Sequence, residues 1–390
     1  MKLTISFSNH TRLAIYSNGG DIMPKKILYA LQGIGMGGVS SVILNYYRML
    51  KESVTADFVV VVPPEHIPSV IREELEQQGC RIFHVTPFVK SMKKYRQEIS
   101  QIIAEGNYDI IHDNDKYFAF LTLGPAKKYG VLNRICHVHN TVAANEKKML
   151  HRLFIKFSSM LSVRYATTLL ACSEEAGRSM FGNHVFKVLN NAINPENFRF
   201  DENKRITLRE KLGLQNSFVI IMVARNDGLK RYDFAFQVFS ELYELRDDAA
   251  FVVVGMSEEE CAGRDRDALE SLTEEKRNRV FLLGRRLDAN DLLNVADAFI
   301  LTSEHEGFGI SIIEAQANGL QCFVSDAIPQ ATKCTDLVSF LPTVKEPEKW
   351  AVEISRACSS NRKEYNDIIA NGEFSIAHNK TILESVYGVK

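Results

Sequence analysis

The stretch that decides the fold reads Ser303-Glu304-His305-Glu306-Gly307-Phe308-Gly309-Ile310-Ser311-Ile312-Ile313-Glu314-Ala315-Gln316-Ala317. It follows an apolar run, residues 298–301, that predicts a buried strand, and it leads into an apolar helical start. A strand, a glycine-bearing loop and a helix N-terminus form an anion site, because free backbone N–H groups and the helix dipole point at the loop. Two carboxylates beside such a site, Glu306 and Glu314, favour a ligand that carries both phosphates and hydroxyls.

The composition is that of a globular protein with room for two domains: 390 residues, of which 45% are hydrophobic and 24% charged. Residues 1–23 hold only a short, broken apolar stretch and no secretory layout, so we expect a dispensable leader there. Seven scattered cysteines without a CxxC pair fit reduced thiols in a cytoplasm.

The charge is divided unevenly along the chain. Residues 1–200 contain 24 Lys and Arg against 16 Asp and Glu, whereas residues 201–390 contain 23 against 32. The basic half indicates an anionic partner. At this level, nucleic acid and an anionic lipid surface both remain open.

Apolar runs of strand length alternate with helical patterns twice along the chain. The runs at 57–62 and 218–223 are continuously apolar, which is typical of parallel strands covered on both faces. The alternation begins near Lys26 and restarts after a polar segment that ends at Phe198. The sequence therefore predicts an α/β protein with two doubly wound domains, 24–200 and 201–363, that face a cleft.

A first glycine cluster, Gly33, Gly35 and Gly38, fits G-x-G-x-x-G between a predicted strand and a helix. A dinucleotide site would also need an acidic residue at the end of the second strand, and Asp57 stands at the start of that strand instead. We therefore set a dehydrogenase aside. A turn whose backbone approaches a ligand remains, with glycines that serve the turn alone as the alternative.

Two cations, Arg225 and Lys230, flank the loop after the strand at 218–223. The carboxyl ends of parallel strands are where α/β proteins bind ligands, so these cations suit the developing charge of a diphosphate leaving group. Glu306 and Glu314 could form an acid/base pair, as in glycoside hydrolases, but their spacing places one in a loop and one inside a helix. We expect Glu314 to accept from a ribose and Glu306 to contact sugar hydroxyls or support the leaving group. A helix-dipole or capping role is the alternative for either residue.

Two further polar groups end predicted strands in the first half. His137 and His139 are expected on opposite faces of their strand, which argues against a joint metal site. Asp113-Asn114-Asp115 matches a short D-x-D pattern that is common by chance, and we expect no metal there.

Together these residues resemble the retaining, nucleotide-sugar-dependent glycosyltransferases of the GT-B fold, in particular the family-four class that builds bacterial capsules, exopolysaccharides and lipopolysaccharides. The resemblance runs from about Lys25 to near the C-terminus. Its most specific part is the E-x7-E pattern from Glu306 to Glu314, followed by Ala315, Ala317 and Gly319. Three segments depart from the family pattern: Ala224 replaces a usual Gly, Ala192 and Asn194 alter the interdomain Asn-Gly-Ile-Asp segment, and Ser40 replaces a frequent Glu.

The resemblance implies roles for individual residues. Arg225 and Lys230 would hold the nucleotide diphosphate, Glu314 the ribose, and His139, with His137 as the fallback, would face the donor sugar. Glu306 and the backbone of the following loop would lie at the sugar and the distal phosphate. The donor-binding set is then Gly37, Gly38, Arg225, Lys230, Glu306, Gly307, Phe308, Gly309, Ile310 and Glu314, and His139, Glu306, Arg225 and Lys230 are the catalytic candidates. A last helix, 364–390, would cross back to the first domain.

The implied activity is the retaining transfer of a hexose or N-acetylhexosamine from a nucleoside-diphosphate sugar, with UDP as the expected nucleotide, to a glycan or lipid-linked glycan. It needs no cofactor, no metal and no nucleic acid. A non-catalytic GT-B scaffold that binds a glycan or a partner transferase is the alternative, and an epimerase or phosphorylase on the same fold is a third reading.

The basic first half then has a candidate purpose. Residues 147–157 interleave Lys and Arg with Leu, Phe and Ile, and Lys93, Lys94 and Arg96 form a second basic cluster. Such a surface suits an anionic membrane, where a lipid-linked acceptor would lie, and predicts peripheral docking on the inner face of the plasma membrane. A core helix with a solvated basic face accounts equally well for the same residues.

Overall fold

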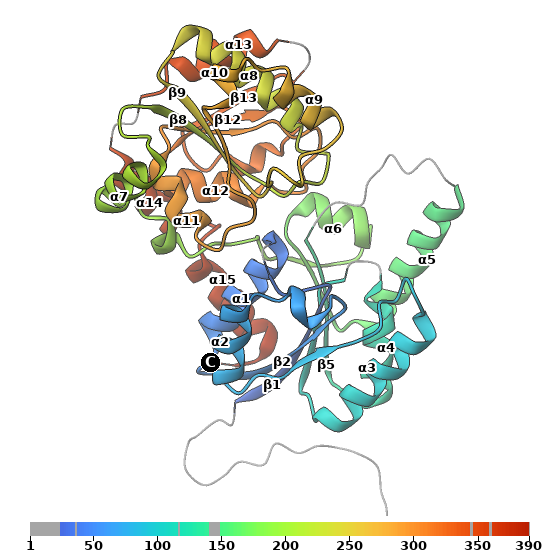
Figure 1. Cartoon of the computed structure of the whole chain (residues 1–390). Coiled ribbons are helices and arrows are strands. Elements are labelled where there is room, and N and C mark those ends of the chain that lie inside the picture. Colours follow the sequence, from blue (N-terminus) through green and yellow to red (C-terminus); the bar gives the residue numbers. More distant parts are fainter. Residues whose placement is uncertain are drawn as a thin grey trace, which may run out of the picture.

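Two parallel β-sheets, each covered by helices, form the protein, a computed structural model that describes residues 24–35, 37–115, 118–139, 149–343, 346–358 and 361–389. The sheets belong to two bodies that lie one above the other in Figure 1. The predicted α/β fold class with two doubly wound domains is confirmed. Within the described ranges, no helix is both long and apolar enough to cross a bilayer. The expected leader, residues 1–23, lies outside the described residues.

The N-terminal domain is built on a seven-stranded sheet in which every neighbouring pair is parallel. In spatial order its strands are β3 (Ile82–His84), β2 (Val54–Val60), β1 (Lys25–Leu31), β4 (Ile110–Asp113), β5 (Asn133–Val138), β6 (Thr168–Ala171) and β7 (Lys187–Val188).

Two separate cores cover the faces of this sheet, and they divide the helices between them. One face carries α1 (Gly38–Leu50), α2 (Ser69–Gln77) and α15 (Ile376–Tyr387). The other carries α3 (Met92–Gly106), α4 (Phe120–Lys128), α5 (Met149–Tyr165) and α6 (Glu174–Phe181). The last helix of the chain is therefore part of the first domain's core.

The C-terminal domain repeats the design with six parallel strands. In spatial order they are β10 (Val280–Leu282), β9 (Ala249–Val254), β8 (Phe218–Val223), β11 (Ala298–Leu301), β12 (Gln321–Ser325) and β13 (Val338–Leu341). The helices are α7 (Glu202–Leu212), α8 (Tyr232–Leu245), α9 (Arg264–Glu270), α10 (Glu274–Arg277), α11 (Ala289–Leu292), α12 (Ile310–Ala317), α13 (Pro347–Ser355) and α14 (Arg362–Ala370). Every residue of β9 and β11 is buried, which explains their unbroken apolar sequences.

The chain passes between the domains twice, and the two passages lie side by side. Residues 190–194 make the first passage and 373–376 the second. They are joined by a parallel bridge between Ile193 and Ser375, in which Ile193 N donates to Phe374 O at 2.9 Å and Ile376 N donates to Ile193 O at 2.9 Å. We call this pair the double crossing.

The single helix predicted after Glu364 is two helices in the structure. α14 packs on α12 of the C-terminal domain, and α15 packs on α1 of the N-terminal domain. The break follows Ala370, and Ser375 caps α15 because its Oγ accepts from Ala377 N at 3.3 Å. The return to the first domain is therefore made by α15 alone.

Candidate active site

A cavity of about 550 Å³ lies between the two domains. Its N-terminal wall comes from the β1–α1 loop, α1, α2 and the end of β5, and its C-terminal wall from loops that follow β8, β10 and β11. The predicted residues that line it are Gly37, Gly38, His139, Arg225, Lys230, Glu306, Phe308, Gly309, Ile310 and Glu314. Gly307 lies in the same loop but outside the lining set. The structure thus brings residues from distant parts of the sequence to one cleft.

Two helix N-termini converge on this cavity, one from each domain. α1 begins at Gly38 and α12 at Ile310, and neither helix has a side-chain cap on its first N–H groups. A Cβ atom on Gly38 would lie 3.4 Å from Ile310 Cγ2, so the two starts are almost in contact. Gly309 precedes α12 with φ of 76°, a left-handed conformation that favours glycine. Both helix dipoles therefore favour an anion at this point.

Lys230 and Glu306 form an ion pair in the wall of the cavity, with side chains only 11% and 15% exposed. Two further contacts hold their loops together. Thr302 Oγ1 donates to Lys230 O at 2.8 Å, and Glu304 N donates to Leu229 O at 2.9 Å. Arg231 adds an ion pair to Glu304 at 2.8 Å. The cation after β8 and the carboxylate after β11 are thus positioned as one unit, while the exposed Arg225 lies at the rim.

Gly255 allows the β8 and β9 loops to approach each other. Its φ is 111°, and a Cβ atom there would lie 1.9 Å from Ala224 O. Tyr232 Oη donates to the same carbonyl at 2.6 Å. The carbonyl of Ala224, where the family pattern has Gly, is therefore fixed from two sides, and Arg225 follows it directly.

Glu314 lies on the first turns of α12 with a part-buried side chain that lines the cavity. Burial raises the pKa of its carboxyl to about 7. Glu306 has a cationic partner, whereas Glu314 faces the cavity from a desolvated wall. The two carboxylates thus have different environments, which suits different roles.

The two predicted histidines lie in unlike places. His139 lines the cavity and is 2% exposed, whereas His137 is fully buried and hydrogen-bonds to His112 Nε2 at 3.1 Å. The expectation that they point to opposite faces is wrong, since residues two apart on a strand share a face. Their ring centroids lie 3.9 Å apart. Burial lowers the pKa of His137 well below its usual value, so this side chain stays neutral.

Asp57, Asp113 and Asp115, which were not expected to bind a ligand or a metal, are all buried. Asp57 accepts from Arg81 Nη2 at 2.7 Å and from Tyr108 Oη at 2.7 Å, far from the glycine loop. Asp113 and Asp115 are buried at the end of β4. Among the described residues, no group of three or more His, Cys, Asp or Glu side chains is arranged to hold a metal ion.

Several lining residues were missed on sequence grounds. Arg285, Arg286 and Leu287 follow β10, and Asn191, Asn197 and Asn290 come from the first passage of the double crossing, the segment after it and α11. The position of the two arginines after a short apolar run, at the same sheet edge as Arg225, was a usable signal. Asn197 and Asn290 carried none, whereas Asn191 begins the segment that resembles the interdomain pattern of the family.

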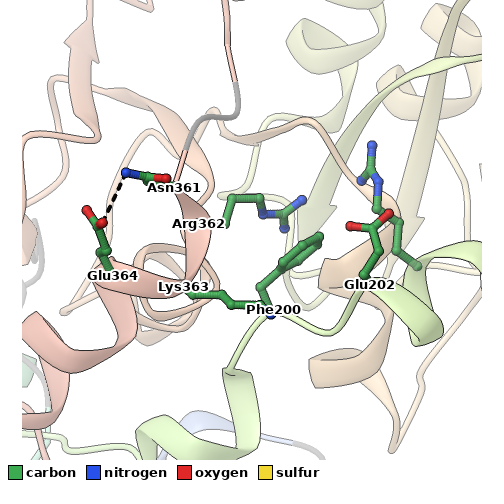
Figure 2. A pocket seen from close by; sticks show the side chains of 7 residues that line it. Phe200, Glu202, Asn361, Arg362, Lys363 and Glu364 are labelled. Carbon is green, nitrogen blue, oxygen red and sulfur yellow. Dashed lines mark hydrogen bonds between the residues drawn. The ribbon is translucent and has the colours of Figure 1, made fainter.

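A second cavity, of about 350 Å³, lies on the C-terminal domain and is shown in Figure 2. The Phe200 ring lies beside the Arg362 guanidinium, 4.1 Å from it. Arg362 donates to the carbonyl oxygens of Asn318 at 3.1 Å and Ala296 at 2.9 Å. Backbone carbonyls already accept the hydrogen bonds that this arginine donates. The second cavity is therefore a gap between packed chain segments.

Comparison with known proteins agrees with this geometry. The family model described as "Glycosyl transferases group 1" matches residues 204–374, which contain Arg225, Lys230, Glu306 and Glu314. The Bacillus subtilis protein named "Putative glycosyltransferase EpsF" is 28% identical over 384 residues, 94% of this chain and 97% of its own length. The resemblance expected from the sequence is confirmed.

Two further proteins extend the comparison. The Escherichia coli protein "UDP-Gal:alpha-D-GlcNAc-diphosphoundecaprenol alpha-1,3-galactosyltransferase" is 28% identical over 61% of this chain and 62% of its own length. The crystal structure of Anabaena Alr3699/HepE in complex with UDP and glucose superposes with a TM-score of 0.72 at 19% identity, covering 93% of this chain and 100% of that one. The structural likeness confirms the GT-B fold.

Proposed function

We propose that the chain, whose residues 204–374 match the family model described as "Glycosyl transferases group 1", is a retaining glycosyltransferase of surface polysaccharide biosynthesis. It transfers a hexose or N-acetylhexosamine from a nucleoside-diphosphate sugar, with UDP as the nucleotide, to a glycan or lipid-linked glycan. The observation that carries this proposal is the meeting of two helix N-termini, the Lys230–Glu306 pair and Glu314 around one cavity. Relatives whose names include diphospho-undecaprenol sugars support the acceptor class.

In this arrangement the diphosphate lies against the helix starts at Gly38 and Ile310, with Arg225 and Lys230 as its cations. The acceptor hydroxyl attacks the anomeric carbon on the face that the diphosphate leaves, so the new bond forms where the old one breaks. The departing phosphate oxygen takes the hydroxyl proton. Glu306, already paired with Lys230, supports that cation and is not a free nucleophile. Protein cations take the place of a metal, so we expect chelators to leave turnover unchanged.

The decisive experiment combines nucleotide binding with donor turnover. A thermal-shift screen against UDP, GDP, ADP and their sugars should show stabilisation by UDP and UDP-sugars. Lys230→Ala should weaken UDP binding by about 30-fold or more, because it removes a cation of the diphosphate and leaves the desolvated Glu306 carboxylate unpaired beside it. Glu306→Ala should lower donor turnover, because Lys230 loses the partner that positions it. Lys333→Ala, at an exposed position, is the control. Absence of both nucleotide binding and turnover in the unmodified protein would favour the scaffold.

We further propose that the first domain docks on an anionic bilayer through the α3–α5 surface. We define this surface by Val89, Met92, Leu153, Phe157 and Met160, whose side chains are 80%, 48%, 58%, 55% and 57% exposed. The apolar residues of α5 recur at i, i+4 and i+7 and therefore share one face.

Two aromatic contacts, one stacked and one tilted, link the segment before α3 to α5 through the segment before α4. Phe88 lies 4.0 Å from Phe118, and Phe118 lies 5.8 Å from Phe154, measured between ring centroids. Exposed Lys90, Lys93 and Lys156 stand next to these apolar residues in the sequence. Between Met149 and Tyr165 there is no Asp or Glu. Exposed apolar side chains rimmed by lysines match the acyl boundary and headgroups of an anionic membrane.

Vesicle flotation tests the α3–α5 surface. The protein should float with vesicles rich in phosphatidylglycerol at low salt and stay unbound with pure phosphatidylcholine. Lys156→Glu combined with Phe157→Ser should abolish flotation, whereas Ile206→Ser, an equally exposed apolar residue on α7, should not. Failure of the unmodified protein to float at low salt would refute the docking and leave the transferase proposal untouched.

A further inference from the structure

His139 stands at the wall of the interdomain cavity, held between two asparagine side chains. Its Nε2 lies 2.8 Å from Asn114 Oδ1, and its Nδ1 lies 2.9 Å from Asn191 Oδ1. Asn114 follows β4 within the first domain, whereas Asn191 belongs to the first passage of the double crossing. One side of the ring is therefore attached to a fixed sheet and the other to the segment between the domains.

Asn114 decides where one proton of His139 lies. Asn114 Nδ2 donates to Ala30 O at 3.3 Å and to His112 O at 3.2 Å. Since the amide nitrogen already faces two carbonyls, the amide oxygen faces His139, and a carbonyl oxygen only accepts. Nε2 of His139 therefore carries a proton. The neutral tautomer with its proton on Nδ1 alone does not fit this arrangement.

Asn191 decides the state of the other nitrogen. With its oxygen toward Nδ1, the ring is doubly protonated; with the amide turned over, Asn191 donates to Nδ1 and the ring is neutral. The neighbouring His137 and His112 do not supply charge, since burial lowers the pKa of both, that of His112 to about 3. The charged side chains that line the same cavity are Arg48, Glu74, Arg225, Lys230, Arg285, Arg286, Glu306 and Glu314, of which Arg48 and Glu74 pair with each other.

The segment that bears Asn191 is tied to both domains within a few residues. Asn190 O accepts from Tyr46 Oη at 2.8 Å and from Asn379 Nδ2 at 2.7 Å, which fixes it to α1 and α15. Ile193 is already bonded into the double crossing. Asn191 therefore lies between a point held by the first domain and the place where a rotation of the second domain must twist the chain.

We propose that Asn191 is a positioning residue that couples domain orientation to His139. In the arrangement described, Asn191 is the hydrogen-bond partner of His139 Nδ1. Rotation of the second domain about the double crossing replaces Asn191 at Nδ1 by a hydroxyl of the bound sugar. Asn114 stays hydrogen-bonded to Nε2 throughout, so His139 contacts its ligand through Nδ1 and not through Nε2. Only the identity of that hydroxyl rests on the proposed function; the proton positions do not.

Nitrogen NMR of histidine-labelled full-length protein tests the proton positions without any substrate. His139→Gln assigns the resonance, and the His139 ring should show a protonated Nε2 at every pH at which the protein is folded. Asn191→Asp should keep the ring doubly protonated about 1–2 pH units higher than in the unmodified protein. Asn194→Asp is the matched control, because it places the same charge three residues away at the cap before Pro195.

Turnover tests the coupling. Asn191→Ala should lower kcat about tenfold to a hundredfold while the KM for the nucleotide sugar changes less than about threefold, because the ring is misplaced and the diphosphate site is intact. Asn191→Asp should shift the acidic limb of the pH profile, and Asn194→Asp should not. A neutral Nδ1–H tautomer, or identical ring titration in the two aspartate variants, would overturn the proposal. If no donor supports turnover, the NMR result still decides it.

Discussion

Glu314 combines a desolvated wall with a pKa of about 7, so its proton is exchangeable near neutral pH. Ribose hydroxyls donate to a carboxylate, so nucleotide binding should favour the ionised form and release a proton below pH 7. UDP affinity should therefore rise about tenfold between pH 6 and pH 8. Calorimetry in buffers of different ionisation enthalpy measures the released proton.

Glu314→Gln supplies the control for this linkage. The UDP phosphate also titrates near pH 6, and that part of the dependence should remain in the variant. The pH dependence of folding stability that arises from Glu314 has the opposite sign to the pH dependence of UDP affinity. Because the folded protein holds this proton above the ordinary carboxyl pKa of 4.5, the contribution of Glu314 to stability falls as the pH rises from about 4.5 to about 7. An unchanged pH dependence in Glu314→Gln would contradict the assignment.

Arg362 shows how much one buried, fully hydrogen-bonded guanidinium contributes to the free energy of unfolding. It is 5% exposed and donates to the carbonyls of Leu293, Ala296 and Asn318. Arg362→Met leaves these acceptors buried without donors, so we expect a loss of about 3 kcal/mol or more in unfolding free energy. Denaturant titration measures it. The adjacent exposed Lys363→Met should lose less than about 0.5 kcal/mol, and equal losses would argue against the saturated arginine.

The helix α15 completes the first domain through contacts with residues near the start of that domain. Tyr387 Oη lies 3.1 Å from Tyr29 Oη and 2.7 Å from His112 Nδ1. Tyr387→Phe removes a partner from both buried groups, and we expect a loss of about 1–3 kcal/mol, read as a lower denaturant midpoint. Tyr129→Phe, at a half-exposed site, should leave the midpoint in place. Similar midpoints for both variants would show that α15 is held by its apolar side alone.

The elements that were predicted from the sequence were those with a clear hydrophobic period or an unbroken apolar run of their own. β8 and β9 are buried on both faces, so an unbroken apolar run identifies them. α9 and α10 are short helices with little apolar periodicity, and their capping signals alone were too weak to predict them. α6 was missed although Ser173 caps it and Glu174 and Glu175 fill its first turn.

The candidate site was predictable where its residues stand just after a predicted strand or at the start of a predicted helix. Arg225, Lys230, Glu306 and Glu314 follow strands and helix starts in recognisable order. The pairing of His139 with Asn114 and Asn191 was not, because those residues lie 25 and 52 positions away and meet only when the sheet and the double crossing form. Polar contacts across such distances leave no periodic pattern in the sequence.

At the scale of the whole molecule, the two domains approach each other closely at the pair of helix starts. A Cβ on Gly38 would meet Ile310 Cγ2 at an ordinary 3.4 Å, so Gly38→Ala should be tolerated within about 0.5 kcal/mol. Gly38→Val adds bulk toward Ile310 and should hold the domains apart. We expect a larger radius of gyration by X-ray scattering and a fall in turnover of about tenfold or more, at an unchanged unfolding midpoint. Normal turnover in Gly38→Val would contradict the closeness of this approach.

The return of α15 to the first domain also fixes an order of events during synthesis. Leu383, Val386 and Tyr387 belong to the core that covers β1, yet they are synthesised after the whole second domain. Residues 201–375 are made in between, which takes roughly 10–35 s at ordinary elongation rates. Throughout that time one face of the first sheet lacks one of the three helices that cover it, while the second sheet has all its strands by Leu341. The core of the first domain can therefore be completed only after the second domain has been synthesised.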